Sequence, residues 1–69
     1  MKDERAVQTL CTLLVSDMQA EVRLAAAEAL GEIRSQKAVA SLNQALLDSE
    51  PRVRARAKWA IKEIEDTDG

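Results

Sequence analysis

Apolar residues recur along the chain at the spacing of one face of a helix. The spacing i, i+3, i+7 occurs at Val7, Leu10 and Leu14 and returns at Val39, Leu42 and Leu46. Two further segments, beginning at Val22 and Val53, carry apolar residues at i, i+4, i+7, i+8 and i+11, so these side chains form one stripe. No segment shows the alternation of a strand. We therefore predict four helices, over residues 4–15, 20–34, 36–47 and 51–65.

The second half of the sequence repeats the first. Residues 6–14 match residues 38–46, and residues 17–33 match residues 48–64. The first copy has one extra residue near Val15 and Ser16, at the end of a helix, where an insertion costs little. Repeat one covers about 3–34 and repeat two about 35–65, with a frayed tail at 66–69. We predict a single all-α domain over 1–69, in which two helical hairpins (four helices) stack as a minimal α-α superhelix, or solenoid.

Residues at the predicted helix starts agree with these boundaries. Asp3 and Ser35 occupy equivalent positions, and both side chains can accept a backbone N–H as N-caps. Pro51 fits the first turn of the fourth helix, where its missing N–H costs nothing.

The composition limits both the core and the compartment. A core of this size rarely supplies more than about 3–5 kcal/mol, and Trp59 is the only aromatic residue. One cysteine and no histidine leave the chain without an internal disulfide or a structural zinc site. No apolar run approaches the roughly 18 residues of a membrane span. The unpaired cysteine and an N-terminus without an apolar segment agree with the reducing cytoplasm.

Two strings of residues resemble those of a known repeat family. One is Asp-Glu-Arg-Ala-Val at residues 3–7, and the other is Val-Arg-Leu-Ala-Ala-Ala-Glu-Ala-Leu-Gly-Glu-Ile at residues 22–33. Both resemble the short HEAT-like repeats named after phycobilisome bilin lyases, and the resemblance covers nearly the whole chain as two units. It implies the solenoid fold. For function it implies a scaffold or an accessory subunit of a bilin-lyase-like complex.

The resemblance also implies a polar ladder between neighbouring repeats. In HEAT-type repeats an aspartate in the turn of the hairpin and an arginine early in the second helix form this ladder. Asp17 with Arg23 and Asp48 with Arg54 hold those positions here. The second copy departs from the family pattern, because Lys62 stands where the first copy has glycine, which is typical of a terminal, capping repeat.

Few residues are suited to catalysis. Cys11 lies beside the stripe of Val7 and Leu14, and no histidine exists to activate it, so we expect a buried, unreactive thiol. Glu28 and Glu32 stand one turn apart on an exposed face, without the desolvated pocket that catalytic carboxylates need. We therefore predict that the chain is not an enzyme, with no catalytic residues, no cofactor and no metal site.

Four basic residues stand at alternate positions of the fourth helix: Arg52, Arg54, Arg56 and Lys58. Residues two apart on a helix do not share a face, so they divide between two flanks. The net charge of −2 gives no general attraction to nucleic acid. We favour a solvated, salt-bridged surface here, and keep nucleic-acid binding through this face as an alternative function.

Trp59 is the candidate for contact with another protein. On a helical wheel the side chains of Trp59 and Leu24 both point away from the predicted hairpin core. Tryptophan is also enriched at binding hot spots. Two repeats leave both ends of the stack uncovered, so we predict a closed homodimer whose interface includes Trp59 with Leu24 or Leu13. The leading function is a non-enzymatic protein-protein interaction or scaffold module that binds a protein partner.

Overall fold

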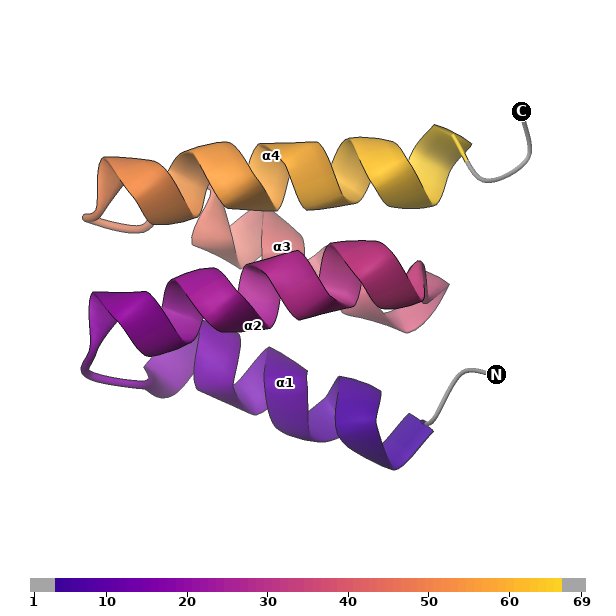
Figure 1. Ribbon diagram of the computed structural model, residues 1–69, viewed down its shortest axis with the longest axis horizontal. Coiled ribbons are helices and arrows are strands. Elements are labelled where there is room, and N and C mark those ends of the chain that lie inside the picture. Colours follow the sequence, from indigo (N-terminus) through magenta and orange to yellow (C-terminus); the bar gives the residue numbers. More distant parts are fainter. Residues whose placement is uncertain (1–3, 67–69) are drawn as a thin grey trace.

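The computed structural model describes residues 4–66. Its helices are α1 (Glu4–Ser16), α2 (Ala20–Ile33), α3 (Val39–Ala45) and α4 (Pro51–Glu65), and the short 3₁₀ helix η1 (Gln36–Ala38) precedes α3. Helices α1 and α2 form one hairpin, and α3 and α4 form the second (Figure 1). The predicted all-α fold of two stacked hairpins is confirmed.

The four helices form two layers. Helices α2 and α4 lie side by side in the front layer of Figure 1, and α1 and α3 lie behind them. The contact between α2 and α4 is the most extensive of all the helix pairs, so this contact joins the two repeats. No helix within residues 4–66 is long and apolar enough to cross a membrane.

The helix boundaries follow local chemistry. Ser35 Oγ accepts the backbone N–H of Lys37 at 3.3 Å, although the helix that it caps begins as η1 rather than as the α-helix predicted from residue 36. Pro51 stands in the first turn of α4, as predicted. Arg34 ends α2 in the left-handed conformation with φ 60°, and its N–H donates to the Leu30 carbonyl. The other predicted cap, Asp3, lies outside the described residues. Asp66 ends the last helical turn, and the rest of the predicted tail also lies outside the described residues.

Small and branched apolar side chains from both repeats make the core. The largest fully buried side chains are Leu14, Leu30, Leu42, Val53 and Ile64. Alanines fill the space between them at 26, 27, 38, 45, 57 and 60. Because alanine is short, the helices approach closely, and a small chain thereby reaches a packed interior without large aromatic side chains.

Candidate functional site

An ion pair links the two repeats at the turn edge of the stack. Arg23 Nε donates to Asp48 Oδ2 at 2.7 Å and Arg23 Nη2 donates to Asp48 Oδ1 at 3.1 Å, which makes a two-pronged contact. Only 14% of the Arg23 side chain and 9% of the Asp48 side chain are exposed. Arg23 Nη1 also donates to the Asp17 carbonyl oxygen at 2.8 Å. The structure thus brings Arg23 and Asp48 together across the repeats, and joins Arg23 to the Asp17 backbone within its own repeat.

The surroundings of Asp48 favour its charged form. The hydrogen bonds from Arg23 lower the pKa of the Asp48 carboxyl, and they outweigh the burial that would raise it. The backbone N–H of Glu50 donates to Asp48 Oδ1 at 2.9 Å and lowers this pKa further. In turn the Asp48 carboxylate raises the pKa of the Arg23 guanidinium.

The other two predicted ladder residues, Asp17 and Arg54, make the same contacts to the turns as Asp48 and Arg23 do. The backbone N–H of Gln19 donates to Asp17 Oδ1 at 2.8 Å, as that of Glu50 does to Asp48. Arg54 Nη1 donates to the Asp48 carbonyl oxygen at 2.7 Å, as Arg23 does to that of Asp17. Among residues 4–66 no ion pair joins the Asp17 carboxylate or the Arg54 guanidinium to a side chain of opposite charge.

Trp59 points away from its own hairpin, as predicted, but it packs against the neighbouring hairpin. Its ring is half-buried and lies against Gly31 of α2, where a Cβ atom would overlap Trp59 Cζ3. The guanidinium carbon of Arg56 stands 5.2 Å from the centre of the ring, within cation–π range. The helical wheel placed Trp59 away from its own hairpin correctly, but the neighbouring hairpin fills that direction. Trp59 is therefore part of the junction between the repeats, with one part of its ring still exposed.

Comparing equivalent positions of the two repeats defines an uncovered face, which we call the N-terminal end. Its residues are Ala6, Leu10, Leu13, Val22, Ala29 and Ile33, all half-buried. Their equivalents in repeat two are Ala38, Leu42, Ala45, Val53, Ala60 and Ile64, all buried. Repeat one covers the second set, and no hairpin among the described residues covers the first. The N-terminal end therefore retains the apolar character of a surface that another helical hairpin covers.

The opposite face, the C-terminal end, carries two basic replacements. Its apolar residues Val39, Leu46 and Ile61 are half-buried, and their equivalents Val7, Leu14 and Leu30 in repeat one are buried. Lys58 and Lys62 stand exposed where repeat one has Ala27 and Gly31. An open groove of ≈ 440 Å³ lies here, lined by Leu46, Ile61 and the two lysines among others. The two ends therefore differ in charge as well as in position.

The three predicted interface residues belong to different surfaces. Leu13 is part of the N-terminal end, and Trp59 covers the α2–α4 junction. Leu24 is half-buried in α2, but its equivalent in α4, Ala55, is exposed, so this position faces outward rather than toward a neighbouring repeat. Two exposed apolar side chains were missed by the sequence analysis: Met18 and Leu47 are 95% and 87% exposed at the turns. Helical periodicity could not find them, because both follow the regular part of a helix.

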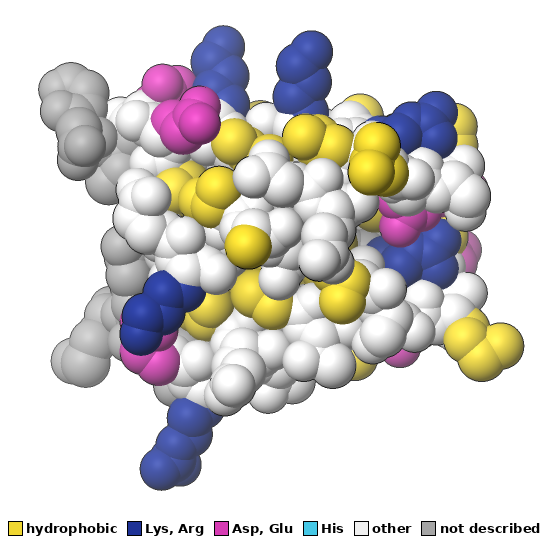
Figure 2. Space-filling view, turned by 180° about the vertical axis from the view of Figure 1, so that it is seen from behind, with side chains coloured by type: hydrophobic (Ala, Val, Ile, Leu, Met, Phe, Trp, Pro, Cys, Tyr) yellow, Lys and Arg dark blue, Asp and Glu magenta, His cyan; other side chains and the backbone are white. Residues whose placement is uncertain are grey.

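Most of the basic side chains of α4 already have partners in the chain. Arg52 Nε lies 3.2 Å from Glu50 Oε1, Arg54 donates to a carbonyl, and Arg56 stacks on Trp59. On the opposite face, formed by α1 and α3, charged side chains lie near the margins and apolar side chains between them (Figure 2). Contacts within the chain thus engage three of the four basic residues predicted as an alternative phosphate-binding face, and the fourth, Lys58, remains exposed.

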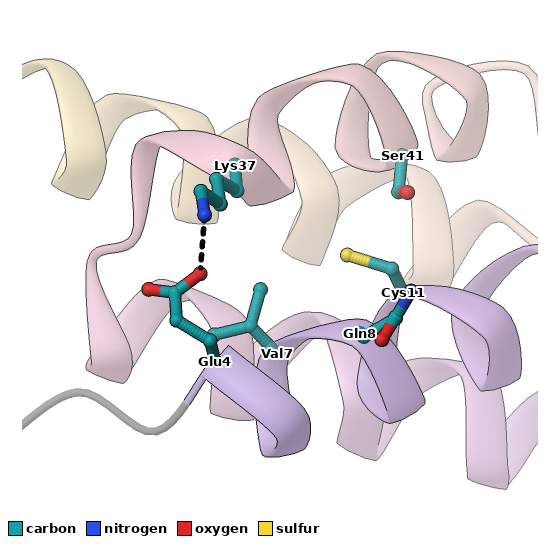
Figure 3. A pocket seen from close by; sticks show the side chains of 6 residues that line it. All are labelled: Glu4, Val7, Gln8, Cys11, Lys37 and Ser41. Carbon is teal, nitrogen blue, oxygen red and sulfur yellow. Dashed lines mark ion pairs between the residues drawn. The ribbon is translucent and has the colours of Figure 1, made fainter.

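Cys11 lies at the edge of the core and is half-buried, so the prediction of a buried thiol is wrong. Its thiol is half-buried and lines a pocket of ≈ 340 Å³ between α1 and α3, together with Val7, Gln8 and Ser41 (Figure 3). An ion pair between Lys37 Nζ and Glu4 Oε1, 3.1 Å apart, borders this pocket. Figure 3 shows the Cys11 sulfur directed into the space between α1 and α3, with Ser41 on the α3 side.

We expect this half-burial to slow the reaction of Cys11 without preventing it. A small thiol reagent should label Cys11 several-fold more slowly than a cysteine introduced at the neighbouring exposed position by Thr12→Cys, in a Cys11→Ser background. Stopped-flow labelling of the two folded proteins measures both rates. Equal rates would show that the core does not shield the Cys11 sulfur.

The described residues offer no metal centre. No group of three or more potential ligands among cysteine, aspartate and glutamate comes together within residues 4–66. Glu28 and Glu32 are both exposed on α2.

Comparison with known proteins identifies one family. The family described as HEAT repeats matches residues 1–68, which is nearly the whole chain. A comparison with curated proteins finds no match.

Proposed function

Because this chain belongs to the family of HEAT repeats, we propose that it is a non-enzymatic module that binds or scaffolds other proteins. HEAT repeats are generally protein-protein interaction scaffolds. The observation that carries the proposal is the N-terminal end, where six apolar positions are half-exposed although their equivalents in repeat two are buried. Exposed apolar surface of this kind is typical of sites that a partner protein covers.

A second copy of the chain is one partner that we propose. Each repeat has only one neighbour, whereas solenoids usually need about three repeats for stability. Association would cover an end of the stack and extend the core, as the predicted homodimer does. Of the three predicted contact residues, Leu13 lies on the N-terminal end that such an association would cover, whereas Trp59 and Leu24 lie on other surfaces.

Two finer proposals concern subtype and location. The string from Val22 to Ile33 supports an accessory role in a bilin-lyase-like complex, as a second candidate within the same binding function. The single cysteine supports a reducing compartment, for which we propose the cytoplasm. The internal contacts of Arg52, Arg54 and Arg56 make nucleic acid the weaker alternative.

A capture experiment tests the binding function. The chain is immobilised, exposed to an extract of its source organism, and the retained proteins are identified by mass spectrometry. The matched control is the double variant Leu10→Asp with Leu13→Asp, which puts charge on the N-terminal end. We expect at least one protein to be retained by the wild type and lost with the control. Retention of nothing specific, together with salt-dependent retardation of duplex DNA, would favour the nucleic-acid alternative instead.

A further inference from the structure

We propose that a second copy of this chain docks end to end, with the C-terminal end of one protomer on the N-terminal end of the next. The junction between protomers would then use the same positions as the junction between the two repeats. This inference rests on the proposed binding function and names both the partner and the surfaces. Three independent sets of positions support it: the ladder residues, the site of Trp59 and Gly31, and the apolar residues.

The ladder residues supply the first complementary pair. Within the chain, Arg23 of repeat one binds Asp48 of repeat two. The next step of the same pattern pairs Arg54 of one protomer with Asp17 of the other. Both groups are preorganised as their equivalents are, since Arg54 donates to a turn carbonyl and Asp17 accepts a turn N–H. Each lacks an ion-pair partner within residues 4–66, which an adjoining protomer would provide.

The contact of Gly31 with Trp59 supplies the second pair. Position 31 faces position 59 across the repeat junction. The equivalent positions at the two ends are 62 and 28, which carry Lys62 and Glu28, both exposed. Docking therefore replaces a glycine–tryptophan contact with a lysine facing a glutamate. These opposite charges compensate for the loss of the small residue that permits close approach within the chain.

The apolar residues of the two ends also correspond. Val7, Leu14 and Leu30 of repeat one face repeat two and are buried, and Val39, Leu46 and Ile61 are their equivalents at the C-terminal end. The six residues of the N-terminal end are equivalents of the side chains that repeat two buries at its junction with repeat one. Docking would thus cover half-exposed apolar side chains on both protomers at once.

Charge favours this arrangement over a two-fold contact between N-terminal ends. A two-fold contact would bring Asp17, Glu28 and Glu32 of one protomer toward the same carboxylates of the other, and like charges across an interface disfavour a complex. End-to-end docking brings Glu65 toward Glu32, the equivalents of Arg34 and Glu63. That internal pair is 52% and 31% exposed, so a like-charge contact at this rim costs little.

Charge exchange at positions 28 and 62 tests the proposal. The wild type should show a rise in average mass between micromolar and millimolar concentration in sedimentation velocity. Glu28→Lys alone and Lys62→Glu alone should each weaken association by about tenfold, because each sets like charges face to face. The double variant should regain association, and so should an equal mixture of the two single variants. Both positions are exposed, so circular dichroism should show unchanged folding for all variants.

Three results would overturn the proposal. They are a wild type that stays monomeric throughout, single variants that associate as the wild type does, and a Glu28→Lys variant that is affected while Lys62→Glu is not. The last result would show the two-fold contact. A monomeric wild type that still captures a partner protein would leave the binding function standing while removing the end-to-end contact.

Discussion

Replacing Gly31 by leucine is expected to lower the free energy of unfolding by about 3 kcal/mol, which is most of the stability that a core of this size supplies. Any side chain at this position enters the α2–α4 junction. Its Cβ would overlap the Trp59 ring and stand 3.0 Å from both Cα and Cβ of Ala60. The ring can turn aside, but the Ala60 backbone can move only if α4 moves away from α2. The gain of about 0.5–1 kcal/mol in helix propensity does not offset this separation of the repeats.

The control for this prediction is the equivalent position of repeat two. Lys62→Leu places the same side chain on the exposed flank of α4, where nothing in residues 4–66 covers it. Its unfolding free energy should therefore stay within about 0.5 kcal/mol of the wild type. Urea denaturation followed by circular dichroism measures both variants. Similar losses in the two would mean that the close approach of α2 and α4 is unimportant to stability.

Asp48→Ala is expected to lower the free energy of unfolding by about 2 kcal/mol, the usual size for hydrogen bonds to a charged group. The substitution removes the acceptor of two bonds from Arg23 and of the Glu50 N–H. Asp17→Ala is the matched control. The Asp17 carboxylate accepts the N–H of Gln19 but forms no ion pair within residues 4–66. Asp17→Ala should lower the free energy of unfolding by well under half as much as Asp48→Ala. Equal losses would assign the effect to the turns rather than to the link between repeats.

The same carboxylate predicts how stability varies with pH. The hydrogen bonds from Arg23 lower the pKa of Asp48 in the folded chain below the value of about 3.9 in an unfolded one. The stabilisation that the Asp48 carboxylate gives the folded chain is therefore fully present above the unfolded pKa. It is lost as the pH falls through the lower pKa of the folded chain. Asp48→Asn should remove this part of the acid-induced loss while the turn keeps its side-chain oxygen. Denaturation curves between neutral and acidic pH test this, and an unchanged pH profile in Asp48→Asn would contradict it.

The sequence predicted the helices well because each one carries a complete apolar stripe. Three of the four predicted segments agree with the structure to within one residue, at α1, α2 and α4. The third differs, since Ser35 caps a 3₁₀ turn and α3 begins only at Val39. Periodicity does not distinguish the two kinds of turn, because a 3₁₀ segment of three residues is too short to shift the pattern.

The candidate site was less predictable because it depends on contacts between repeats. A helical wheel describes one helix, and it could show that Trp59 leaves its own hairpin but not that Gly31 receives it. The signal that was available is the pair Ala27 and Gly31, two small residues one turn apart on α2. Small residues at that spacing permit a neighbouring helix to approach. Cys11 shows the same limitation, since the short Ser41 on α3 opens the pocket beside it.

The junction between α2 and α4 also determines how cooperatively the chain unfolds. Solenoid stability is the sum of the intrinsic stability of each repeat and the coupling between neighbours. This chain has one such coupling, and it buries side chains of both hairpins, including Leu30 from the first and Val53 from the second. Neither hairpin retains a closed core when the other unfolds. We therefore expect the chain to melt as one unit, without a populated state in which a single repeat stays folded.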